Sequence, residues 1–347
     1  MNQTDIASMT MPELTAFLEG MGEKKYRAKQ IYAWIHKRGA QSVDEMTDLS
    51  LSLRERLGQT CMYDPPRQVI VQQSQLDGTR KYLFELSDGN RIESVLMRYH
   101  HGNSVCISSQ AGCRMGCTFC ASAIGGLSRN LTAGEMLGQI CQIQKDIGGR
   151  ISNVVVMGTG EPLDNYANLL RFLRMLTDED GLHISQRNIT VSTCGIVPRI
   201  YDLAEEKLAI TLAVSLHASS QAQREQLMPV AKRYTIEELM QACEDYFSKT
   251  GRRVSFEYSV IAGQNDTPED AKRLADLLCG KNCHVNLIPV NPVTESGYRA
   301  PKREQTERFK KTLEKYGINV TIRREMGRDI DGACGQLRMR AAQTPDF

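Results

Sequence analysis

The sequence predicts an α/β fold in which a small helical module and a short antiparallel sheet precede a series of strand–helix units. Three observations support this prediction. The chain has 347 residues, of which 41% are hydrophobic and 24% are charged, which is the usual composition of a globular protein. Apolar residues follow a helical period near the N-terminus and a period of two between residues 68 and 98. Beyond residue 98, apolar strands alternate with amphipathic helices.

The first 98 residues are expected to form helices and then a three-stranded meander. Helical spacing of apolar residues predicts helices over residues 11–20, 26–37 and 48–57. The apolar face of the second helix is formed by Ala28, Ile31, Tyr32 and Ile35. Alternation predicts strands over residues 68–73, 79–86 and 90–98, because Asp-Gly turn sequences separate these segments.

The rest of the chain reads as repeated βα units. The expected strands are residues 104–108, 153–157, 188–192, 210–215, 254–260, 284–289 and 318–323. The expected helices between them are residues 133–147, 166–175, 198–205, 236–248, 268–278 and 304–316. Such alternation implies a mainly parallel sheet, either doubly wound or closed toward a barrel, and in both cases ligands gather at the carboxyl ends of the strands.

Composition and charge exclude several classes of protein. No apolar run approaches the length of a membrane span, and the N-terminus lacks the pattern of a signal peptide, so we expect a cytoplasmic protein without a membrane partner. Lysine and arginine number 43 against 41 acidic residues, so any surface for nucleic acid must be local. Eleven cysteines in such a compartment do not indicate a disulfide framework.

Three of these cysteines form a cluster that points to an iron–sulfur centre. Cys113, Cys117 and Cys120 have the spacing C-x3-C-x2-C, directly after an expected strand that carries Cys106. Three thiolates on a tight loop can hold a 4Fe–4S cube and leave its fourth iron open for a substrate. The alternative is structural zinc, but a closed zinc site needs four ligands, and no cysteine or histidine nearby completes such a set.

The cluster spacing, with Phe119 before its third cysteine, resembles the signature of radical S-adenosylmethionine (SAM) enzymes. That resemblance implies a partial (β/α)6 barrel of the TIM type, a 4Fe–4S cluster and SAM bound on its open iron. The loop Gly158-Thr159-Gly160-Glu161-Pro162 follows the next expected strand and supports the resemblance. We expect its glycines to let the backbone approach the ligand and its carboxylate to suit the methionine ammonium group.

Further segments are similar to the RlmN/Cfr family of RNA adenosine methyltransferases. They include NSVCISSQAGCRMGCTFC, GLSRNLTAGE, MGTGEPLDN, AVSLHA, HVNLIPVNP and DIDGACGQL. The resemblance implies four parts: a helical RNA-binding module over residues 1–60, an antiparallel β extension over 61–98, a radical SAM core over 99–329 and a tail over 330–347 that carries Cys334.

The family's chemistry implies roles for three residues. Cys334 would first be methylated by one SAM, and a radical from a second SAM would then remove hydrogen from this methyl group, so that its carbon adds to the adenine ring. Glu93 matches the family's proton acceptor, and Cys106 would release the product by forming a transient disulfide with Cys334. By alternation alone, however, Glu93 faces outward and is expected at the surface.

Other positions match SAM contacts in the family. They are Gly160, Glu161, Ser192, Ser215, Leu216, His217 and Asn291. Taken alone, His217 and Ser192 are also typical of polar residues that merely end a strand.

The family further implies that carbon-2 of an adenosine in 23S rRNA is methylated, as well as the adenosine 3′ of the anticodon in certain tRNAs. We expect a monomer that takes electrons from a one-electron reductant such as flavodoxin or ferredoxin. Local charge agrees with an RNA partner. Residues 20–38 hold six basic residues against one glutamate, and residues 297–328 hold ten against four. Charge runs are also common on ordinary solvated surfaces.

Three alternatives remain open from the sequence. A Cfr-like enzyme would methylate carbon-8 of the same rRNA base. Another radical SAM oxidoreductase or activating enzyme would need the cluster but would give Cys334 no role. A zinc-binding or RNA-binding module without catalysis would bind zinc in place of iron.

Overall fold

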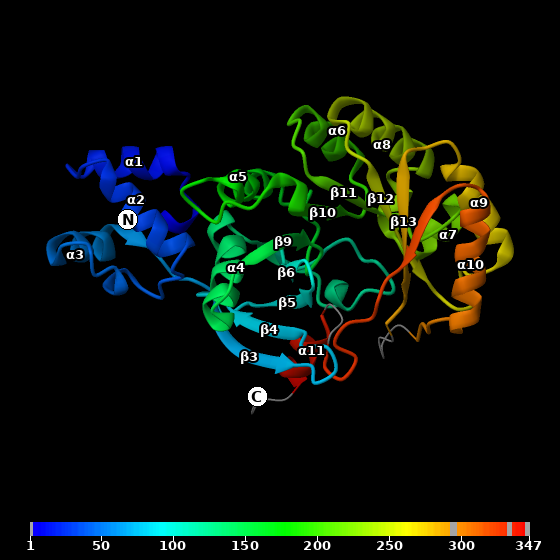
Figure 1. Ribbon diagram of the computed structural model, residues 1–347, viewed down its shortest axis with the longest axis horizontal. Coiled ribbons are helices and arrows are strands. Elements are labelled where there is room, and N and C mark those ends of the chain that lie inside the picture. Colours follow the sequence, from blue (N-terminus) through cyan, green and yellow to red (C-terminus); the bar gives the residue numbers. More distant parts are fainter. Residues whose placement is uncertain (1–2, 292–296, 332–334, 344–347) are drawn as a thin grey trace.

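A ten-stranded mixed sheet forms the centre of the computed structural model, which describes residues 3–291, 297–331 and 335–343 (Figure 1). In spatial order its strands are β14 (Asn319–Ile322), β13 (Cys283–Pro289), β12 (Val254–Val260), β11 (Thr211–Ser215), β10 (Ile189–Thr193), β9 (Ile151–Val156), β6 (Gly102–Cys106), β5 (Arg91–Tyr99), β4 (Arg80–Glu85) and β3 (Arg67–Gln73). All ten strands were expected from the sequence, with ends that differ by one or two residues.

The strands from β6 to β14 are parallel and follow one another in chain order. A doubly wound sheet would reverse its order at a switch point, so that alternative is excluded. The helices of this half are α4 (Ala133–Ile147), α5 (Tyr166–Thr177), α6 (Val197–Glu205), α7 (Gln221–Leu227), α8 (Ile236–Thr250), α9 (Pro268–Leu278) and α10 (Arg303–Lys315). Because β6 pairs with β5 rather than with β14, the barrel stays open and the expected partial (β/α)6 barrel is confirmed.

The antiparallel strands extend this sheet instead of forming a separate one. β5 pairs with β6 from Val95 opposite Cys106 to Tyr99 opposite Gly102. The helix α11 (Gln336–Gln343) lies beside these strands, and its Leu337 packs with Leu83 and Ile70 (Figure 1). This covering explains why β4 and β5 are buried on both faces, which their alternating sequence did not suggest. The division of the chain into four parts stays a prediction.

The N-terminal helices are α1 (Met11–Gly20), α2 (Tyr26–His36) and α3 (Leu51–Thr60). The predicted face of α2 is buried, together with His36. The third helix begins at Leu51 and not at residue 48, because the hydroxyl of Ser50 caps it by accepting the N–H of Leu53. The carboxylate of Asp48 instead accepts the indole N–H of Trp34 at 2.6 Å.

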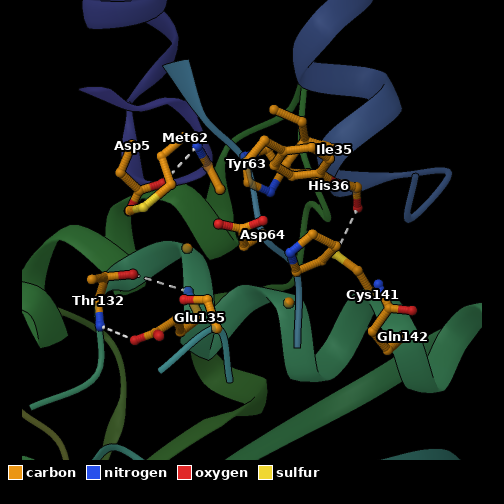
Figure 2. A pocket seen from close by; sticks show the side chains of 15 residues that line it. Asp5, Ile35, His36, Met62, Tyr63, Asp64, Thr132, Glu135, Cys141 and Gln142 are labelled. Atoms are coloured by element: carbon orange, nitrogen blue, oxygen red, sulfur yellow. Dashed lines mark hydrogen bonds between the residues drawn. The ribbon is translucent and has the colours of Figure 1, made fainter. Parts of the chain in front are cut away.

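The N-terminal helices dock on α4 around a small cavity of about 40 Å³ (Figure 2). The thiol of Cys141 on α4 donates to the backbone oxygen of His36, and the amide of Gln41 donates to Gln142 at 2.6 Å. Figure 2 shows Ile35, His36 and Tyr63 near one another, Thr132 and Glu135 farther from them, and a dashed line from Cys141 to the backbone oxygen of His36. These contacts attach the module to the helix that follows the cysteine cluster.

Several short elements were missed by the sequence prediction. They are the strand pairs β1 (Thr4–Asp5) with β2 (Cys61–Met62) and β7 (Gln110–Gly112) with β8 (Leu127–Asn130), the helices α7 and α11, and five 3-10 turns. Most span fewer residues than a period needs to show. Within the described residues, no helix is both long and apolar enough to cross a membrane.

Candidate active site

The three clustered cysteines lie on a loop whose ends are held together by a short antiparallel pair. β7 and β8 flank the loop, with Gln110 opposite Asn130. The backbone N–H of Cys113 donates to the oxygen of Gly126 at 2.9 Å, and that of Thr118 donates to Leu227 of α7 at 3.0 Å. The loop is therefore attached at both ends and to the following βα units, which fixes where its thiols lie.

These thiols open into a cavity of about 260 Å³ at the carboxyl ends of the parallel strands, which we call the cluster cavity. Every predicted cluster and SAM position except Leu216 lines it. These positions are Cys113, Cys117, Cys120, Gly160, Glu161, Ser192, Ser215, His217 and Asn291. Ser192 and Ser215 lie at the ends of β10 and β11, and the other positions lie in loops that follow strands, so the fold brings together residues that lie up to 178 positions apart in the sequence.

The thiols suit a cluster better than a single metal ion. Within the described residues, no three His, Cys, Asp or Glu side chains converge on a point where one ion could be held. A cube spreads its thiolates over separate corners, so they need not converge on one atom. Burial raises the pKa of Cys113 to about 11 and also raises that of Cys117, so these ligands would be thiolates only with a strong positive partner. The donor set therefore fits three corners of an iron–sulfur cube.

Gly160 is required by the chain itself. Its φ is +108°, and a Cβ at this position would lie 2.6 Å from the Cβ of Gln110. We expected the glycine to let the backbone approach a ligand, whereas the close approach is to the segment before the cluster loop. Both carboxylate oxygens of the next residue, Glu161, accept backbone N–H groups, from Leu163 at 3.0 Å and Cys194 at 2.7 Å. This residue fixes the loop after β10.

His217 is held as a neutral imidazole. Its Nδ1 accepts the backbone N–H of Ser259 at 2.9 Å, which leaves the proton on Nε2. Burial, together with the nearby Arg224 guanidinium, lowers the pKa of His217 to about 3. The left-handed φ of +53° at His217 is uncommon for such a residue and is found at functional sites. Leu216, by contrast, is buried in the main core and does not line the cavity.

A second cavity of about 760 Å³ adjoins the first, and we call it the Cys106 cavity. It lies over β5 and β6 and under the chain that follows β14. The two cavities share Ile288, Asn291 and Arg323. Three further features define the second one: Cys106 itself at the end of β6, and the arginines Arg324 and Arg328. Glu325 and Asp331 also line this cavity, and Glu325 is ion-paired with Arg328, so Arg323 and Arg324 are the arginines of the wall that could meet a phosphate-bearing ligand.

Glu93 lies on the same face of the sheet as this cavity and is 3% exposed, so the expectation of a surface position was wrong. The alternation of apolar and polar residues in this strand does not show that a tail segment covers this face. One carboxylate oxygen accepts the backbone N–H of Gly335 at 2.6 Å and the other accepts that of Arg338 at 2.6 Å. The ammonium of Lys81, which is fully buried, lies 2.8 Å from Glu93.

Cys334 lies outside the described residues. Its neighbour Gly335 is described, and this residue contacts Glu93, two positions along β5 from Val95, which is opposite Cys106. Lys81 was not among the residues predicted from the sequence, although its charge, opposite to that of Glu93 on an adjacent predicted strand, was an available signal. Arg224 was not predicted either, because a seven-residue helix carries too weak a period.

The comparisons with known proteins agree with these observations. Residues 4–62 match the family "Ribosomal RNA large subunit methyltransferase N-terminal domain", and residues 107–278 match the radical SAM superfamily. A protein of Lachnospira eligens, named "Probable dual-specificity RNA methyltransferase RlmN", is 59% identical over 99% of this chain and 98% of its own length. A protein of the same name from Lachnoclostridium phytofermentans is 58% identical over 96% and 94%. The crystal structure of a radical SAM methyltransferase from Sphaerobacter thermophilus has a TM-score of 0.92 at 44% identity, covering 96% of this chain and 98% of that one.

Proposed function

Because the chain belongs to the RlmN family of radical SAM RNA methyltransferases, we propose that it methylates carbon-2 of an adenosine in 23S rRNA and the adenosine 3′ of the anticodon in certain tRNAs. The observation that carries this proposal is the contact between Glu93 and Gly335. It brings the tail residue next to Cys334 to the sheet face that carries Glu93 and Cys106. The three proposed catalytic residues would thus act at one place.

We assign the cluster cavity to the cofactors. Cys113, Cys117 and Cys120 would hold the 4Fe–4S cluster. When bound, the cluster would hold SAM at its open iron and supply the electron that cleaves it. Polar residues on the opposite wall would orient SAM, with the Nε2–H of His217 as a donor and the carbonyl and amide groups of Asn291 at the boundary with the second cavity. Glu161 would act mainly through the backbone that it fixes.

We assign the Cys106 cavity to the target base. Cys334 would accept a methyl group from SAM by displacement and later carry its carbon to the adenine ring, which is not nucleophilic at carbon-2. Glu93 would take the ring proton as the product forms. Attack by the Cys106 thiolate on the Cys334 sulfur would form a disulfide bond and break the carbon–sulfur bond. The electron pair of that bond would leave with the carbon, which takes up a proton to complete the methyl group and frees the RNA. A reductant then restores both thiols. Two SAM molecules are consumed per methyl group transferred.

Charged surfaces support an RNA partner. Arg323 and Arg324 lie around the Cys106 cavity, where they would contact phosphates beside the inserted base, while Arg328 is paired with Glu325. In the N-terminal module, Lys24, Arg27 and Lys37 add positive charge, while Lys25 and Lys29 are paired with acidic residues. We propose that this module binds RNA at a distance from the chemistry. A cytoplasmic monomer that takes electrons from flavodoxin or ferredoxin fits this function.

The experiment that tests the proposal has two parts. Mass spectrometry of the purified protein should find one added methyl group on the peptide that contains Cys334, and nucleoside analysis of treated rRNA should find 2-methyladenosine. 8-Methyladenosine as the main product would show carbon-8 chemistry instead. Full turnover by a Cys334→Ser variant would contradict the proposal, and one bound zinc in place of iron in anaerobically prepared protein would contradict the cluster.

A further inference from the structure

Arg224 is the largest side chain that is fully buried in the described structure, and the proposed mechanism gives it no role. It lies on α7. One terminal nitrogen, Nη2, donates to the backbone oxygens of Cys194 at 2.7 Å and Ser215 at 3.4 Å, and Nη1 donates to Tyr234 at 3.5 Å. Its Nε has no hydrogen-bond partner among the described residues. The guanidinium group is thus held in a fixed orientation by carbonyl groups.

No carboxylate of the described residues lies within ion-pair distance of Arg224, since it is absent from every ion pair found there. A guanidinium remains charged at physiological pH and cannot escape by losing its proton. Burial of an uncompensated charge is costly, and buried arginines are normally paired with an acid. An anion is therefore expected near Arg224 in the functional protein.

The position of Arg224 identifies this anion. Cys194 and Ser215, which accept its hydrogen bonds, both line the cluster cavity. The same helix is tied to the cluster loop through the oxygen of Leu227, which accepts the N–H of Thr118.

The chain also makes space for the guanidinium. Gly195 has a φ of +99°, and a Cβ at this position would lie 3.0 Å from Nη2 of Arg224. The same Cβ would lie 3.0 Å from the side chain of Leu239, so a side chain here would push the guanidinium group away from the oxygen of Cys194. The glycine thus leaves room for both Arg224 and Leu239.

We propose that Arg224 is the buried countercharge of the iron–sulfur cluster and that it makes reduction of the cluster more favourable. A 4Fe–4S cube with three thiolates carries net negative charge, and the reducing electron adds to it. A fixed positive charge in a medium of low polarity stabilises the more negative state. Arg224 is a positioning residue in this account, because it touches neither SAM nor RNA.

This inference rests on the proposed cluster, and its test separates the two. Wild-type protein and variants are reconstituted with iron and sulfide without oxygen, and the cluster is titrated with reductant while its electron paramagnetic resonance is recorded. In Arg224→Gln, which keeps a donor for the oxygen of Cys194, reduction should become about tenfold less favourable, equivalent to about 59 mV for one electron. Arg224→Met should give the same shift.

Two controls isolate the charge. Arg224→Lys keeps the positive charge but loses the planar fork. The equilibrium constant for reduction of its cluster should therefore stay within about twofold of the wild-type value. Arg199→Gln removes the same charge from the half-exposed surface of α6, where water screens it, and should leave the potential unchanged. Circular dichroism of the metal-free variants checks that each is folded. If either Arg224→Gln or Arg224→Met does not fold, the other one still tests the loss of charge.

An unchanged potential in both neutral variants would overturn the inference, and so would an equal shift in Arg224→Lys, which would assign the effect to hydrogen bonding. Failure of the wild-type protein to bind iron would instead overturn the proposed function.

Discussion

The cluster cavity and the Cys106 cavity share a wall, but the chain builds them in different ways. The first is assembled at the ends of parallel strands whose order the strand–helix pattern predicts, although its SAM positions were assigned by resemblance to the family. The second depends on antiparallel strands and on a tail whose Gly335 lies 242 positions from its partner Glu93. The comparison teaches that the pattern of strands and helices predicts a site built by strand order, whereas only the resemblance to a family connects a distant tail with the strands that it covers.

The largest expected effect tests whether the two cavities are functionally separate. Cys106→Ala should lower turnover about 10³-fold or more, because the resolving thiol is lost, while iron content stays at the wild-type level. RNA should remain covalently attached to this variant, which a denaturing gel with labelled RNA would detect. Cys113→Ala is the matched control, since it should lose iron and form no attached RNA. A Cys106→Ala protein without iron would contradict the division into two cavities.

The next effect concerns the ion pair that anchors the second cavity. Lys81→Met should reduce the free energy of unfolding by about 3 kcal/mol, because it leaves the buried carboxylate of Glu93 without its ammonium partner. The double variant Lys81→Met/Glu93→Gln should recover part of this loss, since the uncompensated charge is gone. Urea unfolding measures both values. Strictly additive losses would show that the two side chains do not depend on each other.

The same contrast sets how much of the molecule the sequence could predict. All ten strands of the main sheet and nine of the helices were expected, because their apolar periods are long enough to read. The cluster loop was found from its spacing. Glu93 was misjudged because alternation reports one buried face, whereas α11 buries the other. Arg224 was missed because α7 is short and its role depends on what the folded cavity holds.

A third prediction compares the two buried histidines, both with a pKa lowered to about 3 by burial. His217 is hydrogen-bonded in the cluster cavity, whereas neither ring nitrogen of His36 has a partner in the described structure. The similar shift therefore does not distinguish a functional histidine from a structural one. The surroundings of the two histidines do distinguish them. His36 packs against Tyr32 with ring centres 4.3 Å apart, where the N-terminal helices meet α4.

A depressed folded-state pKa means that stability is fully present above the unfolded value of about 6.5 and falls as pH decreases toward 3. Between pH 7 and pH 5, His36 should cost the protein about 2 kcal/mol, and His36→Phe should remove this part of the loss. Fluorescence of Trp34, the one tryptophan of the chain, follows unfolding of the same helix. The ionisable groups around the same cavity, Asp5, Asp64, Glu135, Tyr63 and Cys141, remain in both proteins. An identical pH dependence would contradict the assignment to His36.

The smallest expected effect concerns Cys194, a fourth cysteine that lines the cluster cavity. Burial raises the pKa of Cys194, as it does for Cys113 and Cys117, so the pKa does not separate this thiol from the cluster cysteines. Cys194 follows β10 and lies outside the C-x3-C-x2-C loop, and we therefore expect it not to be a metal ligand. Cys194→Ser should therefore keep the wild-type iron content. It should cost less than about 1 kcal/mol in stability, because the serine hydroxyl can form the hydrogen bond that the thiol makes with Glu161. A site with four cysteine ligands, as in structural zinc centres, would lose its metal in this variant. Metal analysis of Cys194→Ser beside Cys113→Ala thus decides whether the cavity holds a metal by three thiols or by four.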